Sequence, residues 1–427
     1  MSSPLARFGF LSFAYFAGIG IFNPFAPLWL QSLGFSALAI GGIASLQSWT
    51  RIVVPYAWSW LGDHSGRRVT LLRVAAAGTV AAATLLLWMR GYTAVAVAVM
   101  LLFGFNGAII PLSEAAVSRH LAATGGFDAG RYGRVRMWGS IGFVVTVLAG
   151  GYALESIGVE RFPLAVLVIN ALMLVAAWRL PLAQDAVRHE TPAPSVWPQL
   201  RRPVVQWFYA SVALTVLAHT SLYTFLSLYL ESLHYSKAQV GILWAVAVAF
   251  EIVFFWLQGR WFDRLSPWRW LQLAAVASAW RFAILALLGH WVLALVLSQA
   301  SHAITFAAHH AACIAILHRQ FPGRLRGRGQ ALYATIGYGL PGVLGGVGGG
   351  WIVERLGYTW LFAAASLAAL LAFGAARRAA RLDAGEPVAG CGGQQTIGPA
   401  RPSAAGAARR SGTAVRRIAP RAGGGAA

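Results

Sequence analysis

Twelve long apolar runs divide this chain, and they constrain its fold more than any other feature. Hydrophobic residues make up 58% of the 427 residues and charged residues only 11%, whereas a soluble globular chain carries about 25% charged residues. A helix that spans a bilayer needs roughly 20 apolar residues, and almost none of the runs shows the polar face of a helix on a soluble core. We therefore predict an all-α integral membrane protein with twelve transmembrane helices. The runs lie at approximately 8–31, 37–61, 69–89, 93–118, 132–154, 162–181, 204–231, 238–260, 269–288, 291–318, 330–352 and 358–376.

The arginines fall mostly in alternate connections between the predicted helices. The net charge of +21 is spread along the chain, so it does not form the basic patch of a nucleic-acid-binding protein. Because positively charged connections stay cytoplasmic, we predict a multi-pass protein with both termini in the cytoplasm. The bias toward Ala, Gly and Arg suggests a bacterial source, and hence the inner membrane. The arginine-rich connections carry Arg67 and Arg68; Arg119, Arg131 and Arg134; Arg188, Arg201 and Arg202; Arg260, Arg264 and Arg269; and Arg319, Arg324, Arg326 and Arg328. The other connections carry only Arg90, Arg161, Lys237 and Arg355.

A proline-rich connection near the middle divides the chain into two sets of six helices. We predict an N-terminal six-helix bundle over residues 1–182, a cytoplasmic linker over 183–203 and a C-terminal six-helix bundle over 204–380. Residues 381–427 are rich in Ala, Gly, Arg and Pro without a hydrophobic period. Such a segment buries too little apolar area to offset the entropy of ordering it, so we predict a disordered basic tail.

A glycine- and arginine-rich motif follows the second apolar run and has a counterpart after the eighth. The two aspartates of these motifs, Asp63 and Asp263, occupy the same place in each half of the chain. An internal repeat of a six-helix unit explains this register; two independent arginine-rich turns are the alternative. The candidate residues of this conformational loop motif are Gly62, Asp63, Gly66, Arg67, Arg68, Asp263 and Arg264.

Ionisable residues within the apolar runs are the strongest candidates for function. A charge at the centre of a spanning helix costs about 2.5–3.5 kcal/mol on insertion scales and therefore defaults to a functional hypothesis. Glu251 and Arg281 lie in neighbouring runs, so we expect that they can pair. The alternative for each residue is a structural ion pair or a satisfied buried histidine. The residues placed near mid-bilayer are Arg51, His219, Glu251, Arg281 and His302.

The tenth run carries the histidines His302, His309 and His310 within its apolar part. At 100° per residue, His302 and His309 share a helix face and His310 points elsewhere. Histidine titrates near neutral pH and can carry a proton. No cysteine or carboxylate completes a metal site, so we predict no metal and no cofactor.

With these residues the sequence resembles those of the major facilitator superfamily, whose loop signature has an Arg where this chain has His64. More closely, the chain resembles the phenylpropionate-permease branch, which is related to the lactose-permease type. In that type a matching Glu and Arg pair and bind the substrate, and many members work as monomers. The lactose-permease helix that matches the tenth run has a Lys and a Glu where this chain has Gln299 and Thr305. The matching residues are Tyr132, Gly133, Arg134, Val135, Arg136, Met137, Trp138, Gly139, Ser140, Arg51, Glu114, His219, Glu251, Arg281 and His302.

The resulting hypothesis is a secondary active transporter, not an enzyme, that takes up a small organic solute such as an aromatic carboxylate together with a proton. Membrane lipid is the other predicted partner, nucleic acid is not one, and the resemblance implies a monomer. The alternatives are a nucleoside or sugar proton symporter, a drug efflux antiporter and a non-transporting membrane receptor or scaffold. The candidate substrate-binding residues are Arg51, Glu114, Arg136 and His219, and the candidate proton-coupling residues are Glu251, Arg281, His302 and His309.

Overall fold

The computed structural model describes residues 4–123, 129–182 and 194–385, and in these ranges the chain folds into helices without strands. Twelve helical spans of this part of the chain are long and apolar enough to cross a membrane. The predicted all-α membrane architecture is confirmed. The first-half elements are α1 (Pro4–Ser32), α2 (Ala37–Ser65), α3 (Arg68–Leu85), α4 (Tyr92–Asn106), α5 (Ile109–Ala123), α6 (Ala129–Ile157), η1 (Val159–Arg161) and α7 (Phe162–Trp178).

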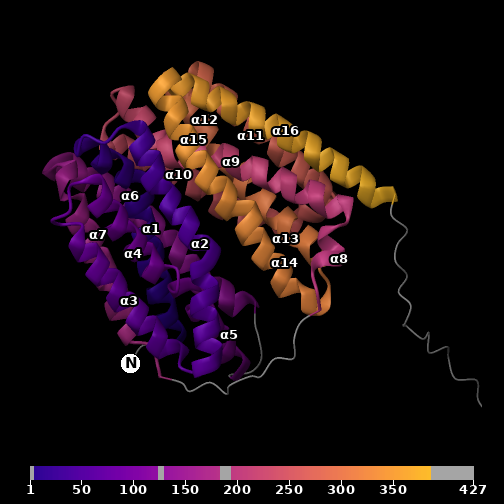
Figure 1. Cartoon of the computed structure of the whole chain (residues 1–427), viewed down its shortest axis with the longest axis horizontal. Helices are drawn as coiled ribbons and strands as arrows, with labels where there is room; N and C mark the ends of the chain where they lie inside the picture. The colour runs from indigo at the N-terminus through magenta and orange to yellow at the C-terminus, as the bar shows by residue number, and fades with distance from the viewer. Residues whose placement is uncertain (1–3, 124–128, 183–193, 386–427) are drawn as a thin grey trace, which may run out of the picture. The chain divides into compact units, whose positions relative to one another are not determined.

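The second half, coloured from magenta to yellow in Figure 1, has more interruptions in its spans. Two of its spans contain π-helices, η4 and η6, which break the regular α-helical hydrogen bonding. The elements are α8 (Trp197–Leu200), α9 (Pro203–Ser232), α10 (Lys237–Leu257), η2 (Gln258–Arg260), η3 (Phe262–Arg264), α11 (Pro267–Leu288), α12 (Val292–Ala300), η4 (Ala303–Ala308), α13 (His309–Gln320), η5 (Gly323–Leu325), α14 (Arg326–Leu332), η6 (Tyr333–Gly339), α15 (Leu340–Leu356) and α16 (Tyr358–Gly385).

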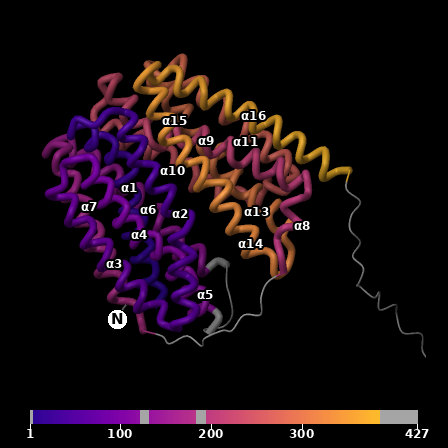
Figure 2. The backbone as a smooth tube through the Cα atoms, in the orientation of Figure 1, coloured from indigo at the N-terminus to yellow at the C-terminus, as the bar shows by residue number. Residues whose placement is uncertain are grey.

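Equivalent helices pack in an equivalent way within the two halves. In the first half α1 packs on α6 and α7, and in the second half α9 packs on α16 and α15. The halves meet where α2 lies against α15 and α6 lies against α10 (Figures 1 and 2). One apolar core crosses this boundary, because it contains Phe25 and Val147 from the first half and Phe225 and Leu243 from the second.

Glycines let the helices of the two halves approach closely. A Cβ added at Gly41 of α2 would collide with the backbone of Gly346 in α15. A Cβ at Gly241 of α10 would come within 2.5 Å of the carbonyl oxygen of Val147 in α6. Small residues at such crossings allow backbone-to-backbone packing in membrane helices, so the glycine-rich part of α15 serves close contact between the halves.

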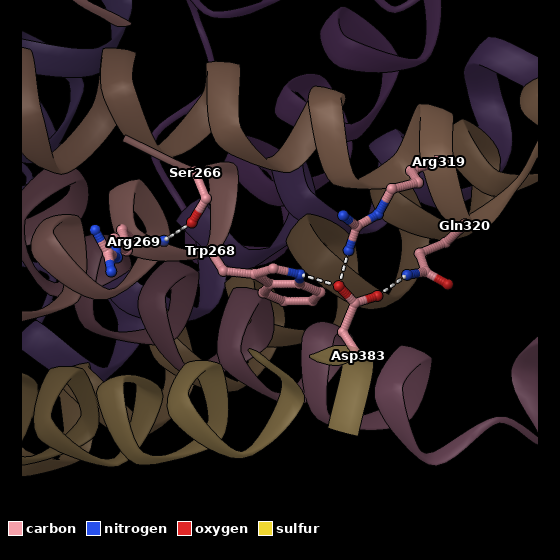
Figure 3. A network of polar contacts seen from close by, with 6 residues as sticks. All are labelled: Ser266, Trp268, Arg269, Arg319, Gln320 and Asp383. Carbon is pink, nitrogen blue, oxygen red and sulfur yellow. Dashed lines mark hydrogen bonds and ion pairs between the residues drawn. The ribbon is translucent and has the colours of Figure 1, made fainter. Parts of the chain in front are cut away.

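The last helix extends five residues beyond the predicted start of the tail. α16 continues to Gly385, so residues 381–385 are helical and the last helix runs past the expected boundary at 380. The reason is Asp383, whose carboxylate accepts hydrogen bonds from Trp268 Nε1 at 2.8 Å and Gln320 Nε2 at 2.9 Å and pairs with Arg319 (Figure 3). These bonds join the ends of α11, α13 and α16, which composition alone did not reveal.

Several predictions fall on residues outside the described ranges. These residues include 183–193 of the linker, 386–427 of the tail and 1–3 at the N-terminus. The bundle boundaries and the cytoplasmic position of both termini therefore stay predictions. The described end of the linker contains the single turn of α8, which leads directly into α9.

Candidate solute cavity

A cavity of about 580 Å³ lies between the two halves of the chain. Its wall comes from α1, α2, α4 and α6 in the first half and from α9, α10, α11, α12, η4, α13, η6 and α15 in the second. A volume of this size is in the range of small-molecule sites. Its aromatic wall includes Phe16, Phe22, Tyr223, Trp244 and Phe306.

Two arginines reach the cavity from the first half. Arg51 lies in α2 and Arg136 in α6, and both side chains are exposed within the structure rather than buried between helices. The guanidinium of Arg136 lies 4.1 Å from the ring centroid of Phe16. A cation over an aromatic face is attracted by the ring quadrupole, and this contact holds the positive group at the cavity wall.

Glu114 does not line the main cavity. It lines a smaller adjoining pocket together with Arg136 and Tyr132, and its carboxylate accepts a hydrogen bond from the hydroxyl of Tyr132 at 3.1 Å. Among the described residues no ion pair joins Glu114 to Arg136. The carboxylate–guanidinium pair that the family resemblance implies is therefore open in this structure.

Three ionisable side chains form a connected row in the second half. Arg281 is fully buried in α11, and its Nη1 lies 3.1 Å from Nδ1 of His302. Nε2 of His302 lies 3.4 Å from a carboxylate oxygen of Glu251. Because a guanidinium can only donate, Nδ1 of His302 accepts and the proton of the neutral imidazole sits on Nε2, facing Glu251. The expected pairing of Glu251 with Arg281 is thus mediated by His302.

The neutral partners of Arg281 come from the same span as His302. Nη1 of Arg281 also donates to Thr305 Oγ1 at 3.0 Å, and Nη2 donates to Gln299 Oε1 at 3.0 Å. Gln299 and Thr305 are the two positions where the resemblance had pointed to charged residues. Here they solvate a buried guanidinium, which would otherwise carry a large desolvation penalty.

His219 of α9 presents one uncommitted nitrogen beside the cavity. Its Nδ1 lies 2.8 Å from the carbonyl oxygen of Thr215, which can only accept, so Nδ1 carries the proton. Nε2 is then a lone-pair acceptor, and it has no partner among the described residues. The ring packs edge-on against Phe282 at 5.2 Å between centroids.

The π-helix changes how the three histidines face the cavity. His302, Phe306 and His310 form a row of stacked rings, with centroids 5.0 Å apart for the first pair and 6.3 Å for the second. His302 and His309 both line the cavity, as their shared face predicted, but His310 lines it too. The prediction that His310 points elsewhere was wrong, because η4 replaces regular α-helix turns with wider ones. His309 is buried and its Nε2 lies 3.7 Å from Cys313 Sγ.

The two loop motifs adopt different conformations. The first closes α2 with Gly66 in the left-handed region at φ 63°, which only glycine adopts readily. Asp63 then pairs with Arg68. In the second motif Asp263 lies in the 3₁₀ turn η3 with Arg264, and Trp268 stands where Arg68 stands in the first. The repeated aspartates are present in register, but the second motif lacks the arginine that would form an equivalent ion pair.

Sequence reasoning missed polar side chains that line the cavity without a charge. The amide of Gln47 donates to Asn23 Oδ1 at 3.4 Å, joining α2 to α1. Tyr333 and Tyr338 of η6 have hydroxyl oxygens 3.1 Å apart. Asparagine and glutamine inside an apolar run were the available signal, whereas nothing in the sequence distinguished these tyrosines from interfacial ones.

Comparison with known proteins identifies the family of this chain, two similar proteins and a solved structure with the same fold. A family model described as the MFS_1 like family matches residues 5–364. The chain is 29% identical over 368 residues to a probable 3-phenylpropionic acid transporter of Escherichia coli (strain K12), covering 84% of this chain and 94% of that protein. It is 28% identical over 367 residues to a maltose permease of Geobacillus stearothermophilus, covering 82% and 88%. The solved structure of the nucleoside transporter NupG superimposes with a TM-score of 0.75 at 16% identity, over 90% of this chain and 99% of that one, which shows a shared fold.

Proposed function

The chain belongs to the MFS_1 like family of major facilitator transporters, and on that premise we propose that it takes up a small aromatic carboxylate together with a proton. Family membership makes it a multi-pass membrane transporter rather than an enzyme. The proposal further includes a bacterial inner membrane, both termini in the cytoplasm and a monomer, following the arginine pattern and the family resemblance.

The charge of the cavity supports an anionic solute. Among the described residues that line it, Arg51, Arg136 and Arg281 stand against one carboxylate, that of Glu251. A surplus of positive charge in a largely apolar site is costly unless an anion compensates it. The aromatic wall suits a ring, and the E. coli relative is described as a probable 3-phenylpropionic acid transporter, so an arylalkyl carboxylate is the proposed class.

The row of Arg281, His302 and Glu251 is the observation that carries the coupling to protons. In the described arrangement Glu251 compensates Arg281 through the neutral imidazole of His302. A proton that binds Glu251 removes this compensation and leaves Arg281 in need of another anion. The solute carboxylate supplies it. Proton and solute therefore favour each other's binding, which couples the two fluxes when the loaded cavity changes access.

Substitution of Glu251 by Gln tests this coupling. Glutamine keeps the shape and a hydrogen-bond acceptor but cannot release a proton. In proteoliposomes we expect Glu251→Gln to lose uptake of labelled 3-phenylpropionate driven by a pH gradient, while exchange of labelled for unlabelled solute continues. Glu160→Gln, which removes an exposed carboxylate from the turn η1, is the control and should retain both activities. Uptake driven by the pH gradient at the wild-type rate in Glu251→Gln would refute the assignment.

A sugar or nucleoside is the second candidate solute. The amides of Asn23 and Gln47 face the cavity and are suited to hydroxyl groups, and one relative is a maltose permease. Competition against labelled 3-phenylpropionate separates the two classes. We expect aryl carboxylates to compete and maltose or uridine not to compete at tenfold higher concentration. Absence of any solute flux in proteoliposomes would instead favour a receptor or scaffold, and sensitisation of deletion strains to lipophilic cations would favour drug efflux.

A further inference from the structure

Two glutamates accept hydrogen bonds from the opposite half of the chain, at the end of the molecule where α2 and α10 begin. Glu155, near the end of α6, accepts a hydrogen bond from the backbone amide of Lys237, the first residue of α10, at 2.6 Å. Glu354, near the end of α15, accepts one from the backbone amide of Leu38, in the first turn of α2, at 3.1 Å. The amides at the start of a helix have no partner within the helix and carry a partial positive charge, so each carboxylate completes a helix of the opposite half.

A glycine one turn earlier accompanies each glutamate. A Cβ at Gly151 would lie 2.7 Å from the carbonyl oxygen of Lys237, and a Cβ at Gly350 would lie 2.6 Å from that of Ala37. The spacing Gly-x-x-x-Glu places both residues on one helix face. The glycine, which has no Cβ, lets the neighbouring helix pack closely. The glutamate can then accept a hydrogen bond from a backbone amide in the first turn of that helix.

The two sites are related by the internal repeat. Glu155 and Glu354 lie 199 positions apart, and the residues that cap α2 and α10, Ser36 and Ser236, lie 200 positions apart. Each serine side chain accepts a hydrogen bond from the third residue of its helix, at 3.3 Å in α2 and 3.2 Å in α10. The same arrangement of glycine, glutamate and capped helix start therefore occurs twice. In one copy the first half supplies the glutamate to α10, and in the other the second half supplies it to α2.

We propose that these two Gly-x-x-x-Glu segments, Gly151–Glu155 and Gly350–Glu354, are paired clamps that hold this end of the cavity closed and release when it opens. Opening this end separates α6 from α10 and α15 from α2, and both carboxylates then lose their amide partners to water. The clamps are exposed, so each adds a modest preference for the closed state that thermal motion can overcome. This inference rests on the chain being a transporter, but not on the identity of the solute or on proton coupling.

Distances between the halves test the clamps directly. Spin labels on Thr93→Cys and His290→Cys, in a chain with Cys313 and Cys391 replaced by Ser, mark the same end of the first and second half. In detergent, without solute or pH gradient, the populations at short and long label separation report the closed and open states. We expect Glu155→Ala and Glu354→Ala each to raise the open-to-closed ratio about threefold, and the double variant about tenfold.

Two further variants keep the result interpretable. The double variant Glu155→Gln, Glu354→Gln keeps neutral hydrogen-bond acceptors. We expect it to change the logarithm of the open-to-closed ratio by about half as much as the double alanine variant does. We also expect it to unfold at the wild-type temperature. Glu231→Ala is the matched control, because Glu231 is a carboxylate that pairs with the side chain of Lys237 at 3.6 Å within the second half. An unchanged distance distribution in the folded double variants, or an equal shift in Glu231→Ala, would overturn the proposal. A failure to detect solute uptake would leave this readout intact and would count against the proposed function alone.

Discussion

Asp63 and Asp383 show how burial changes the contribution of a carboxylate to the stability of the fold. The side chain of Asp63 is 54% exposed and, within the described part of the chain, pairs with Arg68. The side chain of Asp383 is 15% exposed and accepts from Trp268, Arg319 and Gln320 at once. Exposed ion pairs contribute little because water screens them, whereas removal of a shared, partly buried acceptor leaves several donors unsatisfied.

We therefore expect Asp383→Ala to lower the free energy of unfolding by about 1–3 kcal/mol, because the indole of Trp268 and the amide of Gln320 lose their acceptor. Asp63→Ala should lower it by less than about 1 kcal/mol. Unfolding midpoints of both purified variants in the same detergent measure the difference. Equal midpoints would show that the network of Asp383 adds nothing beyond a surface ion pair.

The buried charges could be found from the sequence, but their pairing could not. An ionisable residue stands out in an apolar run, so Glu251, Arg281 and His302 were identified and the structure brings them together at one cavity. Glu251 and Arg281, which we expected to be able to pair, are linked through His302. The length of an apolar run fixes neither the rotation of its helix nor its depth, and these decide which atoms meet.

At the scale of whole elements, the number of spans was predictable and their irregularities were not. Apolar length alone gave twelve spans because lipid requires satisfied backbone hydrogen bonds over the full bilayer. The π-helix η4 left no such signal, since its residues Ala303–Ala308 read as an ordinary apolar segment. The face assigned to His310 from regular helix geometry was wrong for that reason, because η4 aligns His310 with His302.

The crossing of α2 and α15 makes a prediction about single methyl groups. Gly41→Ala places a Cβ against the backbone of Gly346, so the two helices must separate and we expect uptake to fall at least tenfold. Gly348 lies in α15, two residues after Gly346, and a Cβ added there meets nothing within 4 Å. Gly348→Ala should therefore keep uptake within about twofold, with a slight gain in stability because alanine has a higher helix propensity than glycine. Initial uptake rates normalised to the amount of folded protein provide the comparison. Similar rates in the two variants would mean that close contact at this crossing is not needed for transport.

At the scale of the whole molecule, the net charge of the cavity should be the same in the empty and the loaded form that change access. Moving an unpaired charge through the low-dielectric part of the protein is costly. If a monovalent carboxylate and one proton move together, no net charge crosses the membrane. Arg281 remains with the protein and is compensated in turn by Glu251 and by the solute, so one proton is exchanged for each solute carboxylate.

This balance predicts that uptake of 3-phenylpropionate is driven by a pH gradient and is indifferent to membrane potential. A potential of 100 mV contributes about 2.3 kcal/mol for each charge that crosses, which would change accumulation roughly fiftyfold for transport of one net charge. Proteoliposomes with valinomycin and opposed potassium gradients impose either sign of potential at constant pH. We expect the accumulation ratio to stay within about twofold across these conditions, because the proton and the carboxylate cancel. A strong dependence on the potential would mean that more than one proton, or none, accompanies each solute, and that Glu251 is not the sole group that exchanges its proton during the cycle.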